Sequence, residues 1–150
     1  MKTSGVIHPE LSELLAAAGH GDRIVLADAG LRIPLDVPRV DLGLTCGVPT
    51  MAQVLAAVRQ DLVIEAAEVA SQFREWSPET YAEVVALLDV DPVAARVHDE
   101  LMADMRENAY AYVKTGDCAA YSSVVLTCGV SFLDEAIAHY TEVHGRPPTM

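Results

Sequence analysis

The stretch GHGDRIVLADAGLRIP, residues 19–34, decides the fold because it contains a short apolar run with turn-forming residues on both sides. The run RIVLADA is too short for a helix, and its continuous hydrophobicity is typical of a strand buried on both faces. His20, Asp22 and Asp28 lie around this run. Either the three side chains form one chemical site, or they occupy the two ends of a strand.

Outward from this strand, apolar periodicity predicts helices that alternate with further strands. Thr50 and Gln53 have the spacing of a capping box, and Ser77 followed by Pro78 predicts another helix start. Residues 62–70 fit a strand or a helix, and a strand is favoured. The expected helices are residues 8–19, 49–60, 77–88, 99–114 and 134–145, and the expected strands are residues 23–29, 39–44, 62–70, 92–98 and 122–130. This order predicts a single layered α/β domain with sites at strand ends.

Composition limits the function classes. The chain has 150 residues and a formal net charge of −12, which disfavours nucleic acid and anionic membrane surfaces as partners. No apolar run is long enough for a membrane span, and no signal peptide is evident, so a cytoplasmic protein is expected. Three cysteines without a C-x-x-C spacing favour reduced core thiols over a disulfide or a zinc site; they are Cys46, Cys118 and Cys128.

Several side chains could carry chemistry. His20 lies between two glycines, where an imidazole could exchange protons near neutral pH, although an exposed loop histidine is the more common reading. Asp28 is either a turn former or a ligand to hydroxyl groups. Asp22 is expected to be a turn residue. No nucleotide-binding loop, nucleophile elbow or zincin motif is present.

A second group of candidates lies in the C-terminal half. His98 is expected to end a strand and, with Asp99 and His20, could in principle bind a metal, although the spacing matches no specific site. Tyr121, Ser122 and Ser123 supply hydroxyl donors and acceptors of the kind that sugars need. The alternative for Tyr121 is an ordinary half-buried tyrosine.

Taken in order, these segments resemble the D-ribose pyranase family, which includes L-fucose mutarotase. The resemblance runs from about residue 6 to Phe132, which divides the chain into a domain of residues 1–132 and a C-terminal extension of residues 133–150. The blocks that carry it are GHGDRIVLADAGLRIP, RVDLGLTCGVPTMAQVLAAV, EAAEVA and TGDCAAYSSVVLTCGVSF. The sequences DAGLRIP and GVPTMAQVL are similar to the ribose branch.

The resemblance implies an isomerase that interconverts pyranose and furanose forms, and anomers, of D-ribose or a similar aldose, without metal or organic cofactor. It also implies a ring-shaped homo-oligomer, a decamer in this family, with sites near subunit boundaries. His20 would be the catalytic acid. The substrate-binding residues would be Asp28, His98, Tyr121, Ser122 and Ser123.

Two departures from the family pattern keep alternatives open. Ser123 stands where the family has asparagine, and the spacing from His98 to the TGD motif is one residue longer than in the ribose branch. A monosaccharide-binding or assembly protein without catalysis, and a mutarotase for a fucose-like sugar, therefore remain the alternatives to a ribose pyranase.

Overall fold

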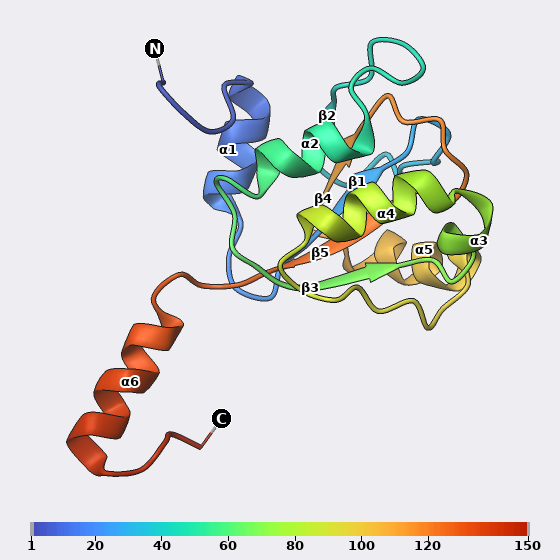
Figure 1. Ribbon diagram of the computed structural model, residues 1–150. Coiled ribbons are helices and arrows are strands. Elements are labelled where there is room, and N and C mark those ends of the chain that lie inside the picture. Colours follow the sequence, from blue (N-terminus) through green and yellow to red (C-terminus); the bar gives the residue numbers. More distant parts are fainter. Residues whose placement is uncertain (1, 150) are drawn as a thin grey trace.

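The computed structural model describes residues 2–149, which form one mixed sheet with helices on both faces (Figure 1). The strands lie in the order β2-β4-β1-β5-β3 across the sheet. Their bounds are β1 Arg23–Ala27, β2 Arg39–Asp41, β3 Ile64–Val69, β4 Ala111–Lys114 and β5 Val124–Cys128. The helices are α1 Pro9–Ala17, α2 Met51–Val58, α3 Phe73–Trp76, α4 Pro78–Leu87, α5 His98–Asn108 and α6 Leu133–His144.

Strand direction fixes which loops share an edge of the sheet. β1 is parallel to β4, and β4 is parallel to β2, whereas β5 is antiparallel to both β1 and β3. The carboxyl ends of β1, β2, β3 and β4 therefore meet the amino end of β5 at one edge. The loops after β1 and before β5 lie there.

The two faces of the sheet bury different helices because successive side chains of a strand point in opposite directions. Ile24 and Leu26 of β1 pack in a core with α1, α2 and α4, and Val25 and Ala27 pack in a second core with α5. This confirms the predicted layered α/β fold. In residues 2–149, no helix combines the length and the hydrophobicity that a membrane crossing would need.

Several predicted elements are confirmed. α2 begins at the predicted capping box, in which the Gln53 N–H donates to Thr50 Oγ1 and the Thr50 N–H donates to Gln53 Oε1. Residues 64–69 form the favoured strand. Ser77 precedes α4 as predicted, but its hydroxyl donates to the Ala120 carbonyl rather than capping the helix.

The prediction of a strand over residues 92–98 and a helix over residues 99–114 was wrong. Within the described part of the segment, Val93 alone bridges to β3, and Pro92 before it has no N–H to donate. His98 consequently begins α5 rather than ending a strand. The helix ends at Asn108, and the β-favouring sequence AYVK forms the interior strand β4.

The expectation of three reduced thiols was also wrong. Cys46 and Cys118, which are 72 residues apart in sequence, form a disulfide, and both residues are exposed. Only Cys128 is a buried free thiol. The local sequence context of each cysteine predicted burial. Local context cannot show that two loops far apart in sequence lie together.

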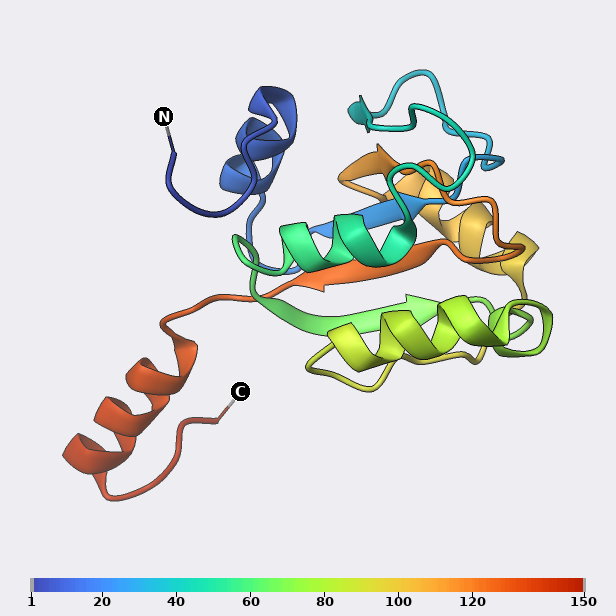
Figure 2. The same cartoon turned by 45° about the horizontal axis from the view of Figure 1, so that its top comes forward.

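The predicted C-terminal helix is present as α6. It projects away from the sheet after β5, and none of its residues is buried (Figure 2). It ends at His144. The next residue, Gly145, has a φ of 65° and adopts the left-handed conformation that is common after a helix. The N-terminal body thus has a complete core without it.

Candidate functional site

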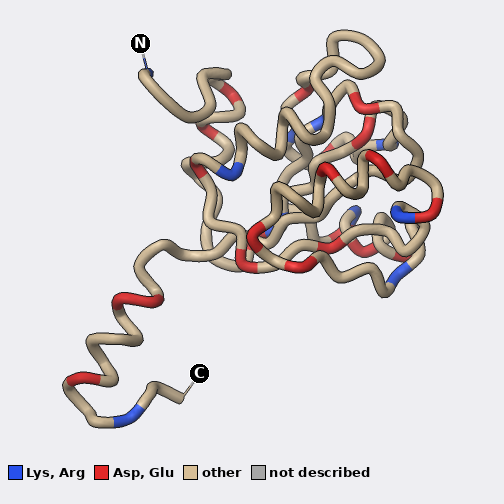
Figure 3. Tube along the Cα trace, in the orientation of Figure 1, with Lys and Arg blue, Asp and Glu red and all other residues tan. Residues whose placement is uncertain are grey.

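A pocket of about 730 Å³ opens at the edge of the sheet where β1 ends and β5 begins. Loops and helices from distant parts of the chain form its walls. Its polar and aromatic lining includes Asp28, Arg32, Trp76, His98, Arg106 and Tyr121. Two arginines in one pocket are notable in a chain with a net charge of −12, whose acidic residues are spread over loops and helices (Figure 3).

Asp28 is positioned by the loop that follows β1. Its Oδ1 accepts a hydrogen bond from the Gly30 N–H at 2.9 Å, and its Oδ2 accepts one from Ser123 Oγ at 2.7 Å. The Asp28 N–H in turn donates to Ser123 Oγ at 3.1 Å. Asp28 is therefore a turn former that also lines the pocket, and its role as a ligand to hydroxyl groups stays a prediction. A carboxylate has about four acceptor sites, which leaves capacity for a ligand hydroxyl.

Three rings form an aromatic wall. Tyr121 packs edge-on against Trp76 and against His98, with ring centroids 5.4 Å apart in each pair. Tyr121 has a φ of 59°, a left-handed conformation that is costly for a bulky residue and is concentrated at functional sites. The surrounding loop thus holds Tyr121 of this wall in a strained backbone conformation.

His98 begins α5, and its backbone N–H donates to Gln72 Oε1 at 3.0 Å. Its Nδ1 is shielded from solvent and has no hydrogen-bond partner in residues 2–149. Buried polar atoms are almost always paired by protein or by water. This nitrogen therefore has hydrogen-bonding capacity that the protein does not use.

The loop between β4 and β5 is organised by the buried carboxylate of Asp117. Its Oδ1 accepts from the Ala119 N–H and from Ser122 Oγ, and its Oδ2 accepts from the Met51 N–H at the start of α2. Ser122 is fully buried and points to Asp117 rather than into the pocket. Of the two adjacent serines, only Ser123 contacts Asp28.

His20 lies at the opposite edge of the sheet, in the loop before β1. Its Nε2 is 2.8 Å from Glu65 Oε2, and both side chains are more than one third exposed. Glu65 lies at a register shift in β3, beside the end of β5. This carboxylate is the nearest charged group to the imidazole and fixes its orientation.

Within one chain, His20 and Asp28 therefore occupy the two ends of β1. The five residues of this strand span about 17 Å at about 3.3 Å per residue. The arrangement also separates His20 from His98 and Asp99, so the three do not converge as a metal site in one chain. Asp22 is the expected turn residue, because its Oδ2 accepts from the Gly19 N–H.

Four residues of these two regions were missed from the sequence. Trp76, Arg32 and Arg106 line the pocket, and Glu65 pairs with His20. Trp76 is the only tryptophan of the chain and lies in the polar sequence REWSPE, which is an available signal for a surface role. Nothing near Glu65 in sequence indicates its partner, because the contact spans 45 residues.

Comparison with known families matches residues 1–131 to the RbsD / FucU transport protein family. The D-ribose pyranase of Coprothermobacter proteolyticus is 39% identical over 132 residues, which cover 88% of this chain and 100% of that protein. The D-ribose pyranase of Paracidovorax citrulli is 41% identical over 132 residues, with the same coverage of both chains.

Solved structures agree with these sequence matches. The structure of Bacillus subtilis RbsD complexed with D-ribose superposes with a TM-score of 0.81 and 30% identity, and the match covers 88% of this chain and 100% of that chain. The fucose mutarotase of Streptococcus pneumoniae in complex with L-fucose gives a TM-score of 0.66 at 23% identity, covering 87% and 99% of the two chains. The latter likeness shows the fold alone.

Proposed function

Because the chain belongs to the RbsD / FucU transport protein family, we propose that it is an isomerase that interconverts the pyranose and furanose forms, and the anomers, of D-ribose or a similar aldose. The single observation that carries this proposal is the Asp28–Ser123 pair at a pocket that has room for a monosaccharide. Relatives named D-ribose pyranase and the ribose-bound neighbour support it. No cofactor is required by this chemistry.

Ring opening of an aldose needs two proton transfers. One proton leaves the anomeric hydroxyl while another reaches the ring oxygen, and the ring then closes through another hydroxyl or onto the other face. General acid–base assistance of roughly 10²–10⁴-fold is available from positioned side chains. In this proposal, Asp28 and His98 accept hydrogen bonds from sugar hydroxyls, and Tyr121 donates one. Ser123 holds the Asp28 carboxylate in place, and Ser122 acts only as a positioning residue through Asp117.

His20 is the proposed catalytic acid, and it reaches a sugar only in the pocket of a neighbouring subunit. The surface around His20 and the surface around Asp28 are different, so a contact between them is heterologous, and repeating such a contact closes a ring when its rotation divides a full turn. This argument supports the homo-oligomeric ring implied by the sequence. Glu65 would then keep the imidazole in one orientation.

The proposed domain arrangement places the whole catalytic unit in residues 1–132. The family match ends at residue 131, and residues 133–149 of the extension contribute no side chain to either region described above. We assign the protein to the cytoplasm, where a monosaccharide substrate would be available to it.

Saturation-transfer proton NMR on D-ribose tests the function directly. The wild-type protein should accelerate exchange between pyranose and furanose, His20→Ala should abolish the acceleration, and His139→Ala, an exposed histidine of α6, should retain it. Acceleration that survives in His20→Ala would refute the catalytic role of His20. Ribose binding in calorimetry without any exchange enhancement would instead favour a binding protein, and activity only with L-fucose would identify a fucose-type mutarotase.

A further inference from the structure

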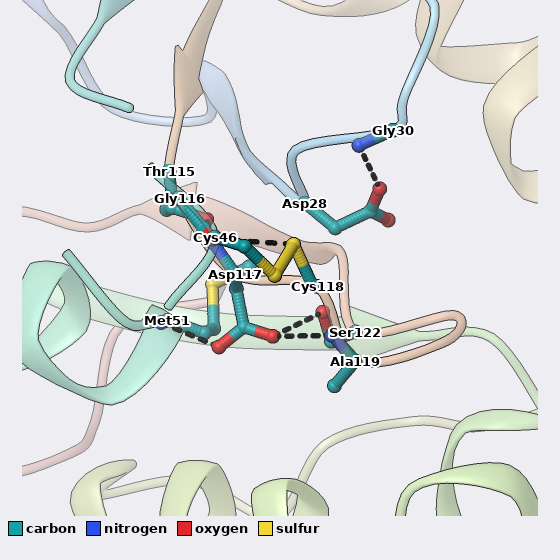
Figure 4. Close-up of a disulfide and its surroundings, with 10 residues drawn as sticks. All are labelled: Asp28, Gly30, Cys46, Met51, Thr115, Gly116, Asp117, Cys118, Ala119 and Ser122. Atoms are coloured by element: carbon teal, nitrogen blue, oxygen red, sulfur yellow. Dashed lines mark hydrogen bonds between the residues drawn. A yellow bond between two sulfur atoms is a disulfide. The ribbon is translucent and has the colours of Figure 1, made fainter. Parts of the chain in front are cut away.

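The disulfide joins two loops that backbone hydrogen bonds already hold together (Figure 4). The Gly47 N–H donates to the Gly116 carbonyl at 2.7 Å, and the Gly116 N–H donates to the Pro49 carbonyl at 2.9 Å. A Cβ atom at Gly116 would collide with the Val48 carbonyl, so this close approach needs glycine. These bonds fix the second loop at Gly116 and so bring the cysteines near each other, whereas the disulfide is the tether at Cys118 itself.

Cys46 and Cys118 lie within reach of each other and of solvent. Their Cα atoms are 5.7 Å apart, within the usual range for a disulfide, and both residues are exposed to reagents from solution. Cys128 differs in both respects: it is buried, and burial raises the pKa of its thiol to about 11. Since the thiolate is the reactive form, Cys128 is a poor competitor for exchange.

The tethered loop carries Tyr121, which belongs to the aromatic wall of the pocket. Cys118 follows Asp117, whose carbonyl accepts from the Ala29 N–H beside Asp28 at 2.7 Å. Three residues after Cys118, Tyr121 holds its left-handed conformation in the pocket wall. A covalent tether at Cys118 thus restrains the segment between the Asp28 loop and Tyr121.

We propose that Cys46 and Cys118 form a redox modification site that sets the affinity of the neighbouring pocket for its sugar. The disulfide form keeps the loop of residues 115–123 in the binding conformation, and the dithiol form lets it move. This inference rests on the proposed sugar-binding function. In a reducing compartment, disulfides are usually transient and regulatory, which agrees with an exposed pair beside a pocket.

The reaction partner is a small-molecule disulfide of the glutathione type. One protein thiolate attacks a sulfur of this disulfide, which forms a mixed disulfide and releases one thiol. The second protein thiolate then attacks the protein sulfur of the mixed disulfide and releases the second thiol. The protein loses two electrons and two protons, and the small disulfide gains them as two thiols. Reduction is the reverse process.

The test measures the dissociation constant for D-ribose by calorimetry after full oxidation with oxidised glutathione and after full reduction with a phosphine. Mass spectrometry of peptides establishes the redox state of each sample. The oxidised protein should bind ribose about three- to tenfold more tightly, because preorganisation lowers the cost of ordering the loop. Cys46→Ser should bind like the reduced protein under both conditions, and the matched control Cys128→Ser should respond like the wild type.

Two results would overturn the inference alone. One is an unchanged ribose affinity in samples whose peptides confirm conversion between dithiol and disulfide. The other is the absence of a peptide that links Cys46 to Cys118 after oxidation. Failure of the wild type to bind ribose in either redox state would overturn the proposed ribose function as well, so the two failures are distinguishable.

Discussion

The hydroxyl group of Ser123 positions the carboxylate of Asp28. It donates to the Asp28 carboxylate and accepts from the Asp28 backbone, so it fixes the position of the carboxylate twice. A longer amide at this position would reach further into the pocket. Position 123 is therefore where we expect the sugar preference of this chain to differ from that of the family.

Replacing Ser123 by alanine tests this arrangement. Ser123→Ala removes a hydrogen bond to a charged group, which is typically worth about 1.5–3 kcal/mol, although a released carboxylate regains part of this from water. We expect ribose to bind about tenfold more weakly, and the unfolding midpoint to fall as well, because the Asp28 N–H also loses its acceptor. Calorimetric titration measures the first quantity and urea unfolding the second. An unchanged affinity would contradict the role given to the Asp28–Ser123 pair.

Trp76 offers a second test in the same pocket. It is 62% exposed and supports Tyr121 edge-on, so its apolar face is available to the C–H groups of a sugar ring. Trp76→Ala should raise KM for ring exchange severalfold and change kcat little, because the residue binds but transfers no proton. The reverse split, a loss in kcat at constant KM, would show that Trp76 acts on the chemical step. Trp76→Phe should recover most of the wild-type KM.

The sequence placed His20 and Asp28 at the two ends of one strand, but it did not indicate the residues from other segments that lie beside them. The strand length alone places His20 and Asp28 at opposite ends of residues 23–27, yet nothing in the sequence shows which surface meets a neighbour. The disulfide was missed for a related reason, because the contact between Cys46 and Cys118 depends on two loops whose approach is decided by the tertiary fold.

Among the elements, the irregular segment before α5 is held by ion pairs in addition to backbone hydrogen bonds between Val93 and β3. Arg96 donates to both carboxylate oxygens of Glu68 at 2.7 Å and to Asp104 at 2.9 Å. Asp104 also accepts from Arg23 and from Asn108. This network fastens residues 92–97 to β3 and α5 and replaces the strand that the sequence indicated.

The network makes a prediction about acid stability. Hydrogen bonds from Arg96, from Asn108 and from Arg23 lower the pKa of the Asp104 carboxyl from its ordinary value of 3.8 to about 2. Its stabilising contribution is therefore complete above pH 4 and is lost as the pH falls toward 2. Asp104→Asn should lower the free energy of unfolding by about 1 kcal/mol at pH 7, a value discounted for partial exposure.

Urea unfolding at pH 7 and at pH 3 measures this effect. The difference between wild type and Asp104→Asn should shrink at the lower pH, because the wild-type carboxyl begins to lose its advantage there. A constant difference at both pH values would mean that the charge of Asp104 contributes nothing to stability.

Helices were predicted better than strands for a physical reason. Capping and apolar spacing are local, so α2 and α4 could be located to within a few residues. β4 lies inside the sheet, between β2 and β1. Its Val113 continues the apolar helical spacing of Leu101 and Met105 by chance. Pairing with β1 and β2 decides its conformation, and pairing partners cannot be read from local sequence.

At the scale of the whole molecule, α6 is an addition to a body that is already complete. It buries no residue, and it lies beyond the last residue of the family match. A chain truncated after Phe132 should therefore keep the unfolding midpoint and the ring-exchange rate of the full chain. Thermal unfolding and saturation-transfer NMR measure these two quantities. A lower midpoint or a slower exchange would show that the extension stabilises the assembly.

The position of His20 and Asp28 at opposite ends of β1 has a genetic consequence. If each pocket takes its histidine from the adjoining subunit, a copy with His20→Ala and a copy with Asp28→Ala fail for different reasons. In a mixed ring, one junction in about four then joins an intact His20 surface to an intact Asp28 surface. Two inactive alleles co-expressed in one cell would restore part of the activity, whereas two copies of either allele would not.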